Sequence, residues 1–230
     1  MNTVFFENLK PALAAERLEA YRQDQAEPHI TLARYLWNMA LCESLYSPLQ
    51  MVEVGLRNAL QRALENHFLT AQWYDKSACY ELLTKTQKSQ ISNAKENLQR
   101  LSKPVSPGRM VAELTFGFWT AFFNKHYAQS RDIVHIATLT FCAAPKSQRD
   151  LQTLNRRLTR LRELRNRVFH HERIIHWTNL DEQHASLLEV IGWIAPELRE
   201  LAEALDRYSQ TRADGLDPWI EKLRHHWPAK

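Results

Sequence analysis

The scarcity of glycine is the feature of this sequence that most restricts its fold. Five glycines among 230 residues amount to about 2%, against ~7% in an average protein. Sheet proteins need glycine for tight turns, bulges and backbone with positive φ. A chain this poor in glycine, and rich in leucine, alanine, arginine and glutamine, is therefore expected to be all-α. The sequence also lacks the GxGxxG and GxxxxGK patterns, which disfavours nucleotide folds built on such phosphate loops.

The composition indicates a globular protein of a reducing compartment. Hydrophobic residues make up 44% of the chain and charged residues 24%, so there is enough apolar side chain for a core. The cysteines, Cys42, Cys79 and Cys142, lie far apart without a CxxC pair, which favours free thiols over a disulfide framework or a cysteine zinc site. No stretch approaches the ~20 apolar residues of a membrane span, and the first residues lack the features of a signal peptide. We therefore expect a cytoplasmic protein that does not bind membranes.

Helical periodicity runs along most of the chain and predicts several helices without an internal repeat. The expected helices span residues 9–23, 31–46, 48–68, 80–101, 110–126, 146–171, 179–208 and 218–227. The string Ser47-Pro48-Leu49-Gln50 has the pattern of a capping box with proline at the first helical position, so a helix is expected to start there. Residues 132–144 could form a helix or a short buried strand. Because no low-complexity linker divides the chain, residues 1–230 are expected to form a single helical domain.

Basic and acidic residues are segregated along the chain, although its net charge is only +4. Residues 146–173 contain nine Lys or Arg and three acids, whereas residues 180–221 contain ten acids and three Arg. A basic helix attracts polyanions, and phosphate contacts dominate affinity for nucleic acids. The basic segment could therefore bind nucleic acid. It could also be a solvated face, or one that the acidic C-terminal helix neutralises within the chain or across a dimer.

The expected helix over residues 146–171 carries an arginine where its apolar stripe calls for a hydrophobic residue. The leucines of this stripe are spaced 3-4-3: Leu151, Leu154, Leu158 and Leu161. The same spacing leads to positions 165 and 168, which are Arg165 and Val168. Because an unpaired guanidinium is costly to bury, Arg165 is expected to have a partner or to face a cleft.

Asn166 and His170 follow Arg165 and lie four residues apart, on one face of the helix. A structural role is an alternative, with Arg165 paired to a carboxylate of a neighbouring helix and His170 hydrogen-bonded at the helix end. Residues five apart on an ideal helix point about 140° apart. Arg165 and His170 would therefore converge only if the helix distorts near its end or if a second subunit completes the site.

These side chains suit the cleavage of RNA by its own 2′-OH, a group that DNA lacks. That reaction needs a base for the 2′-OH, a proton for the leaving 5′-oxygen and cations for the phosphorane. Histidine, with an ordinary pKa of ~6.5, suits the proton transfers, so His170 is the candidate acid–base group. Arg165 suits a bidentate grip on phosphate oxygens, and Asn166 would orient the phosphate or a partner subunit's histidine. Arg162, Arg167 and Arg173 are candidate phosphate contacts.

Four strings in order resemble the Abi-like (AbiD/AbiF-type) abortive infection proteins of bacteria. They are Glu43-Ser-Leu-Tyr-Ser-Pro-Leu-Gln50, Val52-Glu-Val-Gly-Leu-Arg-Asn58, Glu113-Leu-Thr-Phe-Gly-Phe-Trp119 and Leu161-Arg-Glu-Leu-Arg-Asn-Arg-Val-Phe-His-His-Glu172. The pattern Arg-Asn-x-x-x-His in the last string is similar to the RX4H motif of HEPN ribonucleases and of type VI CRISPR effector nucleases. The resemblance implies a HEPN-like helical bundle with additional N-terminal helices, and a homodimer that juxtaposes two motifs. It also implies metal-independent RNA cleavage without a cofactor, in antiphage defence or as a toxin with a protein or small-RNA antitoxin.

Several other residues have both a structural and a functional interpretation. Glu53 and Arg57 are four apart and could form a plain helix ion pair, or together with Asn58 could support the motif, as the resemblance suggests. His171 is a further candidate for RNA contact, and the string from His171 to His176 mimics the HExxH zinc motif. It is one residue too long to place both histidines on one helix face, so no metal site is expected. Glu172 stands where HEPN toxins silenced by nucleotidylation have tyrosine.

Two other classes of function are compatible with the same residues. A non-catalytic RNA-binding module would use the same basic helix, and its binding of RNA would depend on its arginines but not on His170. A purely structural helical protein would show no salt-dependent binding of RNA.

Overall fold

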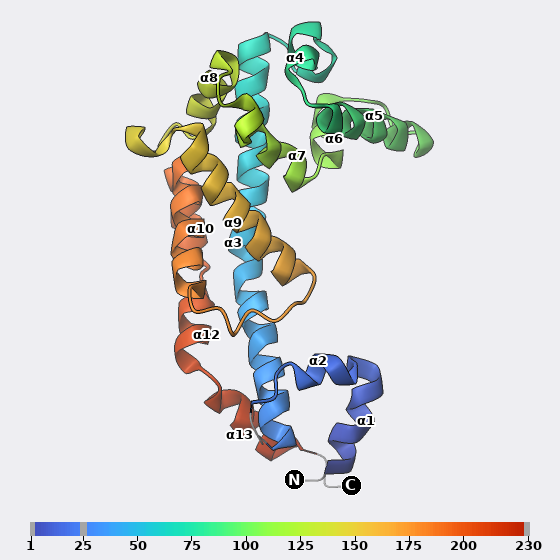
Figure 1. Ribbon diagram of the computed structural model, residues 1–230, viewed down its shortest axis with the longest axis vertical. Helices are drawn as coiled ribbons and strands as arrows, with labels where there is room; N and C mark the ends of the chain where they lie inside the picture. Colours follow the sequence, from blue (N-terminus) through green and yellow to red (C-terminus); the bar gives the residue numbers. More distant parts are fainter. Residues whose placement is uncertain (1–2, 24–26, 228–230) are drawn as a thin grey trace. The chain divides into compact units, whose positions relative to one another are not determined.

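The computed structural model describes residues 3–23 and 27–227, and every regular element within these ranges is helical (Figure 1). The predicted all-α fold is thus confirmed. The chain divides into two compact units, each made of separate stretches of sequence. The terminal unit comprises Met1–Ser47, Arg165–His184 and Leu205–Lys230, and the central unit comprises Pro48–Leu164 and Ala185–Ala204.

Three helices contribute residues to both units: α3 (Pro28–Phe68), α9 (Leu151–Phe169) and α10 (Leu180–Ile194). The other helices of the terminal unit are α1 (Thr3–Leu13), α2 (Ala15–Glu19), α12 (Tyr208–Asp214) and α13 (Asp217–His226). Those of the central unit are α4 (Ser77–Leu82), α5 (Lys85–Arg100), α6 (Pro107–Glu113), α7 (Phe116–Thr120), α8 (Arg131–Thr140) and α11 (Pro196–Ala204). The single domain expected over residues 1–230 stays a prediction.

Each unit has hydrophobic packing of its own. In the terminal unit, Phe6 of α1, Leu18 of α2 and Leu32 of α3 form a buried cluster, against which Leu223 and Trp227 pack from the C-terminal end. This cluster attaches the short N-terminal helices to α3. The cluster thereby positions α2, whose Arg17 contacts the segment that follows α9.

In the central unit, the aromatic residues between positions 116 and 123 are buried and form a cluster in the core. The ring of Phe118 lies 5.1 Å from that of Trp119 and 5.6 Å from that of Phe122, centroid to centroid. Trp73 packs against the same rings. Edge-to-face aromatic pairs add to the stabilisation that burial itself provides.

Helix α3 is one helix of 41 residues where the sequence predicted two. Pro48, the expected start of the second helix, lies inside it. Proline inside a helix removes a hydrogen bond and costs ~3 kcal/mol or more. Leu45, Leu49 and Val52 are almost completely buried on either side of it. Burial of these side chains favours the helical path through Pro48, so the predicted helix start was wrong.

Other predicted helices are also divided. The segment predicted as 9–23 forms α1 and α2, which meet at Ala14 in a positive-φ conformation. The segment predicted as 110–126 breaks where Thr115 accepts a hydrogen bond from the backbone N–H of Phe118 (3.3 Å) and caps α7. Side chains such as Thr115 can satisfy the unpaired N–H groups at a helix start, a signal that hydrophobic periodicity does not report.

The aromatic cluster makes a testable contribution to stability. We expect Phe118→Ala to lower the free energy of unfolding by about 3–5 kcal/mol, because it leaves a cavity in a fully buried core. Val134→Ala on α8 is the control, since that side chain is 43% exposed and should cost less than about 1 kcal/mol. Urea denaturation followed by circular dichroism measures both values. Equal losses would contradict the assignment of this cluster as the core.

Candidate functional site

The buried stripe of α9 passes beside Arg165. Leu161, Leu164 and Val168 are at most 4% exposed, so the stripe continues through Leu164. The expectation that Arg165 occupies a buried stripe position was therefore wrong, because the fully buried residue between Leu161 and Val168 is Leu164. Arg165 is half-buried, and its guanidinium lies 4.5 Å from the ring centroid of Phe169, one turn later.

The end of α9 is a Schellman motif, which sets the direction of the residues that follow. The backbone N–H of His171 donates to the carbonyl of Val168 (3.1 Å), and that of Glu172 donates to the carbonyl of Arg167 (2.8 Å). His171 takes the left-handed conformation that this motif requires (φ 57°). The side chains of Arg167 and Glu172 form an ion pair across it. Consequently, α9 ends at Phe169, and His170 lies exposed at the helix end.

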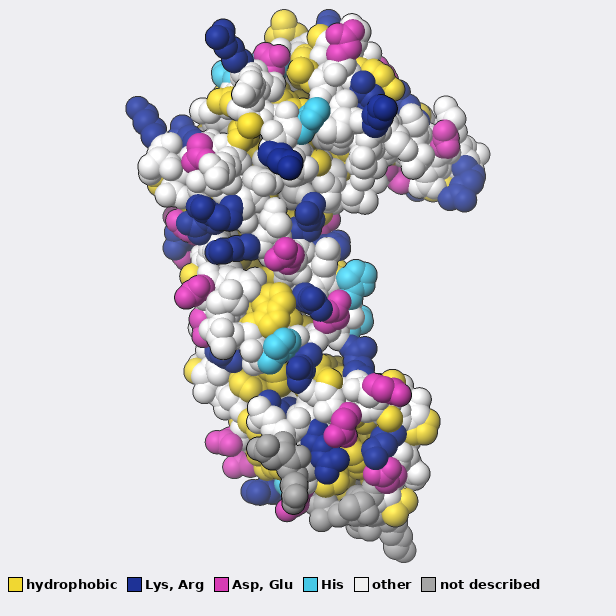
Figure 2. All heavy atoms as spheres, viewed as in Figure 1, with side chains coloured by type: hydrophobic (Ala, Val, Ile, Leu, Met, Phe, Trp, Pro, Cys, Tyr) yellow, Lys and Arg dark blue, Asp and Glu magenta, His cyan; other side chains and the backbone are white. Residues whose placement is uncertain are grey.

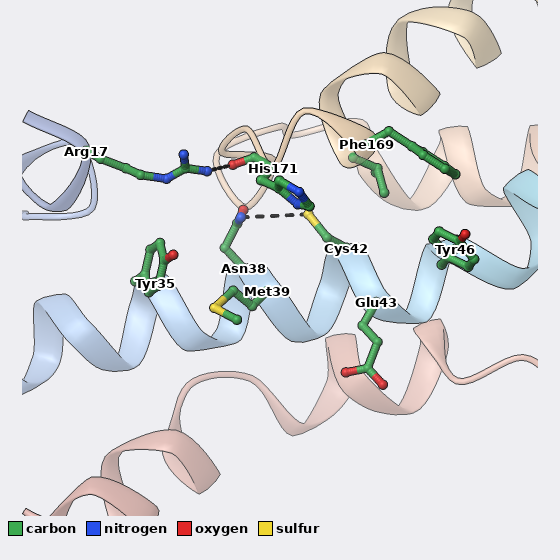
Figure 3. A pocket seen from close by; sticks show the side chains of 10 residues that line it. Arg17, Tyr35, Asn38, Met39, Cys42, Glu43, Tyr46, Phe169 and His171 are labelled. Atoms are coloured by element: carbon green, nitrogen blue, oxygen red, sulfur yellow. Dashed lines mark hydrogen bonds between the residues drawn. The ribbon is translucent and has the colours of Figure 1, made fainter. Parts of the chain in front are cut away.

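Asn38 of α3 holds the segment after the motif in place. Its side chain is buried, and its Oδ1 accepts hydrogen bonds from the backbone N–H groups of Ile174 (2.8 Å) and Ile175 (3.3 Å). Its Nδ2 donates to the carbonyl of Glu172 (3.2 Å). Figure 3 shows Asn38 pointing from α3 toward this segment. One amide thus satisfies three backbone groups of a short irregular segment, which would otherwise be costly to bury.

Two arginines connect α2 to the same segment. Arg17 of α2 donates a hydrogen bond to the carbonyl of His171 (Figure 3), and Arg173 donates to the carbonyl of Ala20. The bonds run in opposite directions between the two segments. They hold two guanidinium groups next to the exposed end of α9.

These residues surround a cleft of about 350 Å³, which we call the basic cleft. Its lining comprises Arg17, Ala20, Tyr21, Arg167, His170, His171, Glu172, Arg173 and His176. Three arginines and three histidines face one carboxylate there, so the cleft favours an anion. Burial, followed by the charges of Arg173 and Arg167, lowers the pKa of His176. Burial raises the pKa of Tyr21 to about 12, against the opposing effect of Arg17, so the phenol stays protonated at neutral pH.

The cleft brings together four of the predicted site residues: Arg167, His170, His171 and Arg173. Asn166 lies on α9, one turn before His170, and is exposed. Arg165 is not among the side chains that line the cleft, and α9 stays helical as far as Phe169. The helix distortion that would make Arg165 and His170 converge is therefore not seen in the described chain.

The remaining predicted residues lie in the central unit. Arg162 is half-buried on α9. Arg57 and Asn58 line a different cavity of about 190 Å³, with Pro107 and Gly108 of α6. Glu53 is half-buried one turn before Arg57 on α3. Their support of the motif stays a prediction.

Sequence reasoning missed Asn38, Arg17, Tyr21 and His176. Asn38 did leave a signal, because it lies three residues before Leu41 and seven before Leu45, both fully buried. A lone amide on an apolar helix stripe indicates a buried hydrogen-bonding role. Arg17 left no such signal, since its position depends on the break between α1 and α2.

The charges of the basic segment are partly neutralised within the chain. In the central unit, Arg157 of α9 contacts Glu189 of α10 (2.6 Å). On the face drawn in Figure 2, basic and acidic side chains are interspersed. The predicted neutralisation by the acidic C-terminal segment is thus confirmed at Arg157. Within the basic cleft, one ion pair, between Arg167 and Glu172, opposes the excess of positive charge.

Among residues 3–23 and 27–227 we find no helix with the length and apolar composition needed to cross a membrane. The same residues contain no group of three or more His, Cys, Asp or Glu side chains placed to hold a metal ion.

Comparison with known proteins identifies the family. A family model described as Abi-like protein matches residues 4–176, well over half of the chain. The chain belongs to the Abi-like family. The match includes the end of α9 and every residue of the basic cleft. It suggests a role of this Abi-like protein in abortive infection. No curated protein and no solved structure gives a significant match.

The role of Asn38 can be measured directly. We expect Asn38→Ala to lower the free energy of unfolding by about 2–4 kcal/mol, because it leaves the buried N–H of Ile174 unpaired at ~1–3 kcal/mol and two half-buried backbone groups unpaired at a smaller cost. Met39→Ala is the matched control, since Met39 follows Asn38 on α3 and its side chain is 50% exposed. Chemical denaturation of both variants gives the values. A loss no larger than that of the control would show that Asn38 does not hold the segment.

Proposed function

We propose that this Abi-like protein is a metal-independent endoribonuclease with a HEPN-like helical bundle. In this proposal it cleaves RNA through attack of the 2′-OH on the adjacent phosphate, in bacterial antiphage defence or as the toxin of a toxin–antitoxin pair. The observation that carries the proposal is the basic cleft, where His170 and three arginines line one cavity at the end of the motif helix.

The chemistry of the cleft matches the needs of this reaction. A phosphodiester is an anion, and the guanidinium groups of Arg17, Arg167 and Arg173 offer charge-assisted hydrogen bonds to its oxygens. His170 is exposed to substrate and would transfer a proton to or from the reacting oxygens. His176 lines the same cleft with a lowered pKa, so it is a second group able to accept a proton near neutral pH.

Arg165 and Asn166 enter this proposal through dimerisation. Arg165 lies over Phe169 and not in the cleft of its own chain. In a homodimer that juxtaposes two motif helices, Arg165 and Asn166 of one copy would reach the phosphate held by the other. Arg162 and His171 would add phosphate contacts, and Glu53, Arg57 and Asn58 would support the motif. The active form is then a dimer, and a protein or small-RNA antitoxin would restrain it in a toxin pair.

Cleavage of RNA in excess EDTA tests the proposal. We expect the wild type to cut a labelled RNA and to leave 2′,3′-cyclic phosphate ends. We expect His170→Ala to lower the rate about 10²- to 10⁴-fold, which is the usual contribution of a general acid or base. His225→Ala is the matched control, because His225 is also exposed but lies on α13, outside the cleft.

The outcomes separate the competing functions. Equal cleavage by the wild type and His170→Ala would overturn the proposed role of His170. Salt-dependent binding of RNA without cleavage, weakened by Arg167→Ala or Arg173→Ala, would identify a non-catalytic RNA-binding module. A structural interaction protein would show neither binding nor cleavage.

A further inference from the structure

A second cavity of about 330 Å³, which we call the apolar pocket, lies beside the basic cleft in the terminal unit. Most of its surface is apolar, and it includes Tyr35, Met39 and Tyr46 of α3 and Phe169 of α9. Figure 3 shows Tyr35 and Tyr46 on the side of α3 that faces the end of α9. Its volume is near the lower end of the ~300–1,000 Å³ range of small-molecule sites, so it suits a group about the size of one nucleoside.

Tyr46 is the exposed aromatic side chain of this pocket. Its ring stacks on that of Phe169, with centroids 5.0 Å apart and planes inclined by 25°. The residue is nevertheless 50% exposed, so part of its aromatic surface is open to a ligand. The guanidinium of Arg165 lies over the same Phe169 ring. The stack thus connects an exposed aromatic surface to the first residue of the motif.

The apolar pocket and the basic cleft share two residues, Arg17 and His171. The hydrogen bond between the Arg17 side chain and the His171 carbonyl therefore lies where the two cavities meet. One cavity offers aromatic surface and the other offers positive charge. A nucleotide has the same two parts, an aromatic base and an anionic phosphate, joined by one sugar.

We propose that the apolar pocket holds one base of a single-stranded RNA, stacked on Tyr46, while the phosphate next to that base lies in the basic cleft. This inference rests on the proposed function, because it assigns a substrate contact to the same site. Stacking on an aromatic ring requires an unstacked base, so the substrate is a single strand or a loop and not a duplex. Every base has a π-face, so Tyr46 contributes affinity and positioning with little sequence preference.

Binding of a 2′-O-methyl oligonucleotide tests this assignment without cleavage, because the attacking 2′-OH is blocked. Fluorescence anisotropy in EDTA would compare the wild type with Tyr46→Leu and Tyr46→Phe. We expect Tyr46→Leu to weaken binding about 5- to 150-fold, which corresponds to ~1–3 kcal/mol per stacked base. Tyr46→Phe keeps the ring and should bind within about twofold of the wild type. Tyr80→Leu is the matched control, because Tyr80 is 42% exposed but lies on α4 in the central unit.

A second measurement does not depend on how well the variants fold. One 2-aminopurine is placed at successive positions of an oligo-uridine with 2′-O-methyl sugars, and its fluorescence is recorded on binding to the wild type. Because the pocket has little sequence preference, the probe can occupy it from any position, so stacking on Tyr46 should quench the fluorescence on binding. Unchanged fluorescence on binding at all positions would overturn the assignment, whatever Tyr46→Leu does.

The outcomes distinguish the base pocket from the proposed ribonuclease. A wild type that binds and cleaves RNA, with Tyr46→Leu equal to it in binding, overturns the base pocket alone. Tyr46-dependent binding without cleavage keeps the base pocket and overturns the nuclease. A wild type that neither binds nor cleaves overturns both. Unchanged RNA binding with a halved mass of Tyr46→Leu in light scattering would assign the surface to a second copy of the chain and overturn the base pocket.

Discussion

The buried amide of Asn38 is the interaction on which the geometry of the candidate site depends. An amide on an apolar helix stripe is unfavourable unless its donors and its acceptor are satisfied. The irregular segment after α9 has the complementary need, because its backbone is partly buried around Ile174 and lies outside any regular helix. Asn38 satisfies both through Glu172, Ile174 and Ile175. The exposed end of α9, with His170 and His171, is thereby held at a defined place beside α3.

The basic cleft shows how several positive charges can be held close together. Arg17 and Arg173 each donate to a backbone carbonyl of the other's segment, and Arg167 pairs with Glu172 across the helix end. A guanidinium carries five N–H donors, so one bond to the protein positions the group while its planar fork can still bind phosphate. Carbonyl oxygens orient the arginines without cancelling their charge. The excess of positive charge is therefore available to an anion, as the proposed function requires.

Some local features were predictable and others were not, for identifiable reasons. The leucine stripe of α9 follows from side-chain spacing alone, and it places Asn166 and His170 on one exposed face. The helix through Pro48 could not be predicted, since a local rule that disfavours proline is outweighed by burial of Leu45, Leu49 and Val52. Arg165 was misplaced by one step, because the stripe advances by three residues from Leu161 to Leu164. A difference of one residue in the position of the buried stripe decides whether a side chain packs in the core or lies over a neighbouring ring.

The sequence by itself determined the all-α class, the motif helix and the concentration of arginine and histidine at its end. Each of these follows from composition or from spacing within a few turns, where the interacting groups are close along the chain. Only the tertiary structure decided that Arg17, Tyr21 and His176 join His170 in one cleft, and that Tyr46 and Phe169 form an aromatic stack beside it. Two of these contacts, Arg17 with His171 and Tyr46 with Phe169, join residues more than a hundred positions apart. They depend on where each helix ends and which groups are buried together, and no local pattern encodes that.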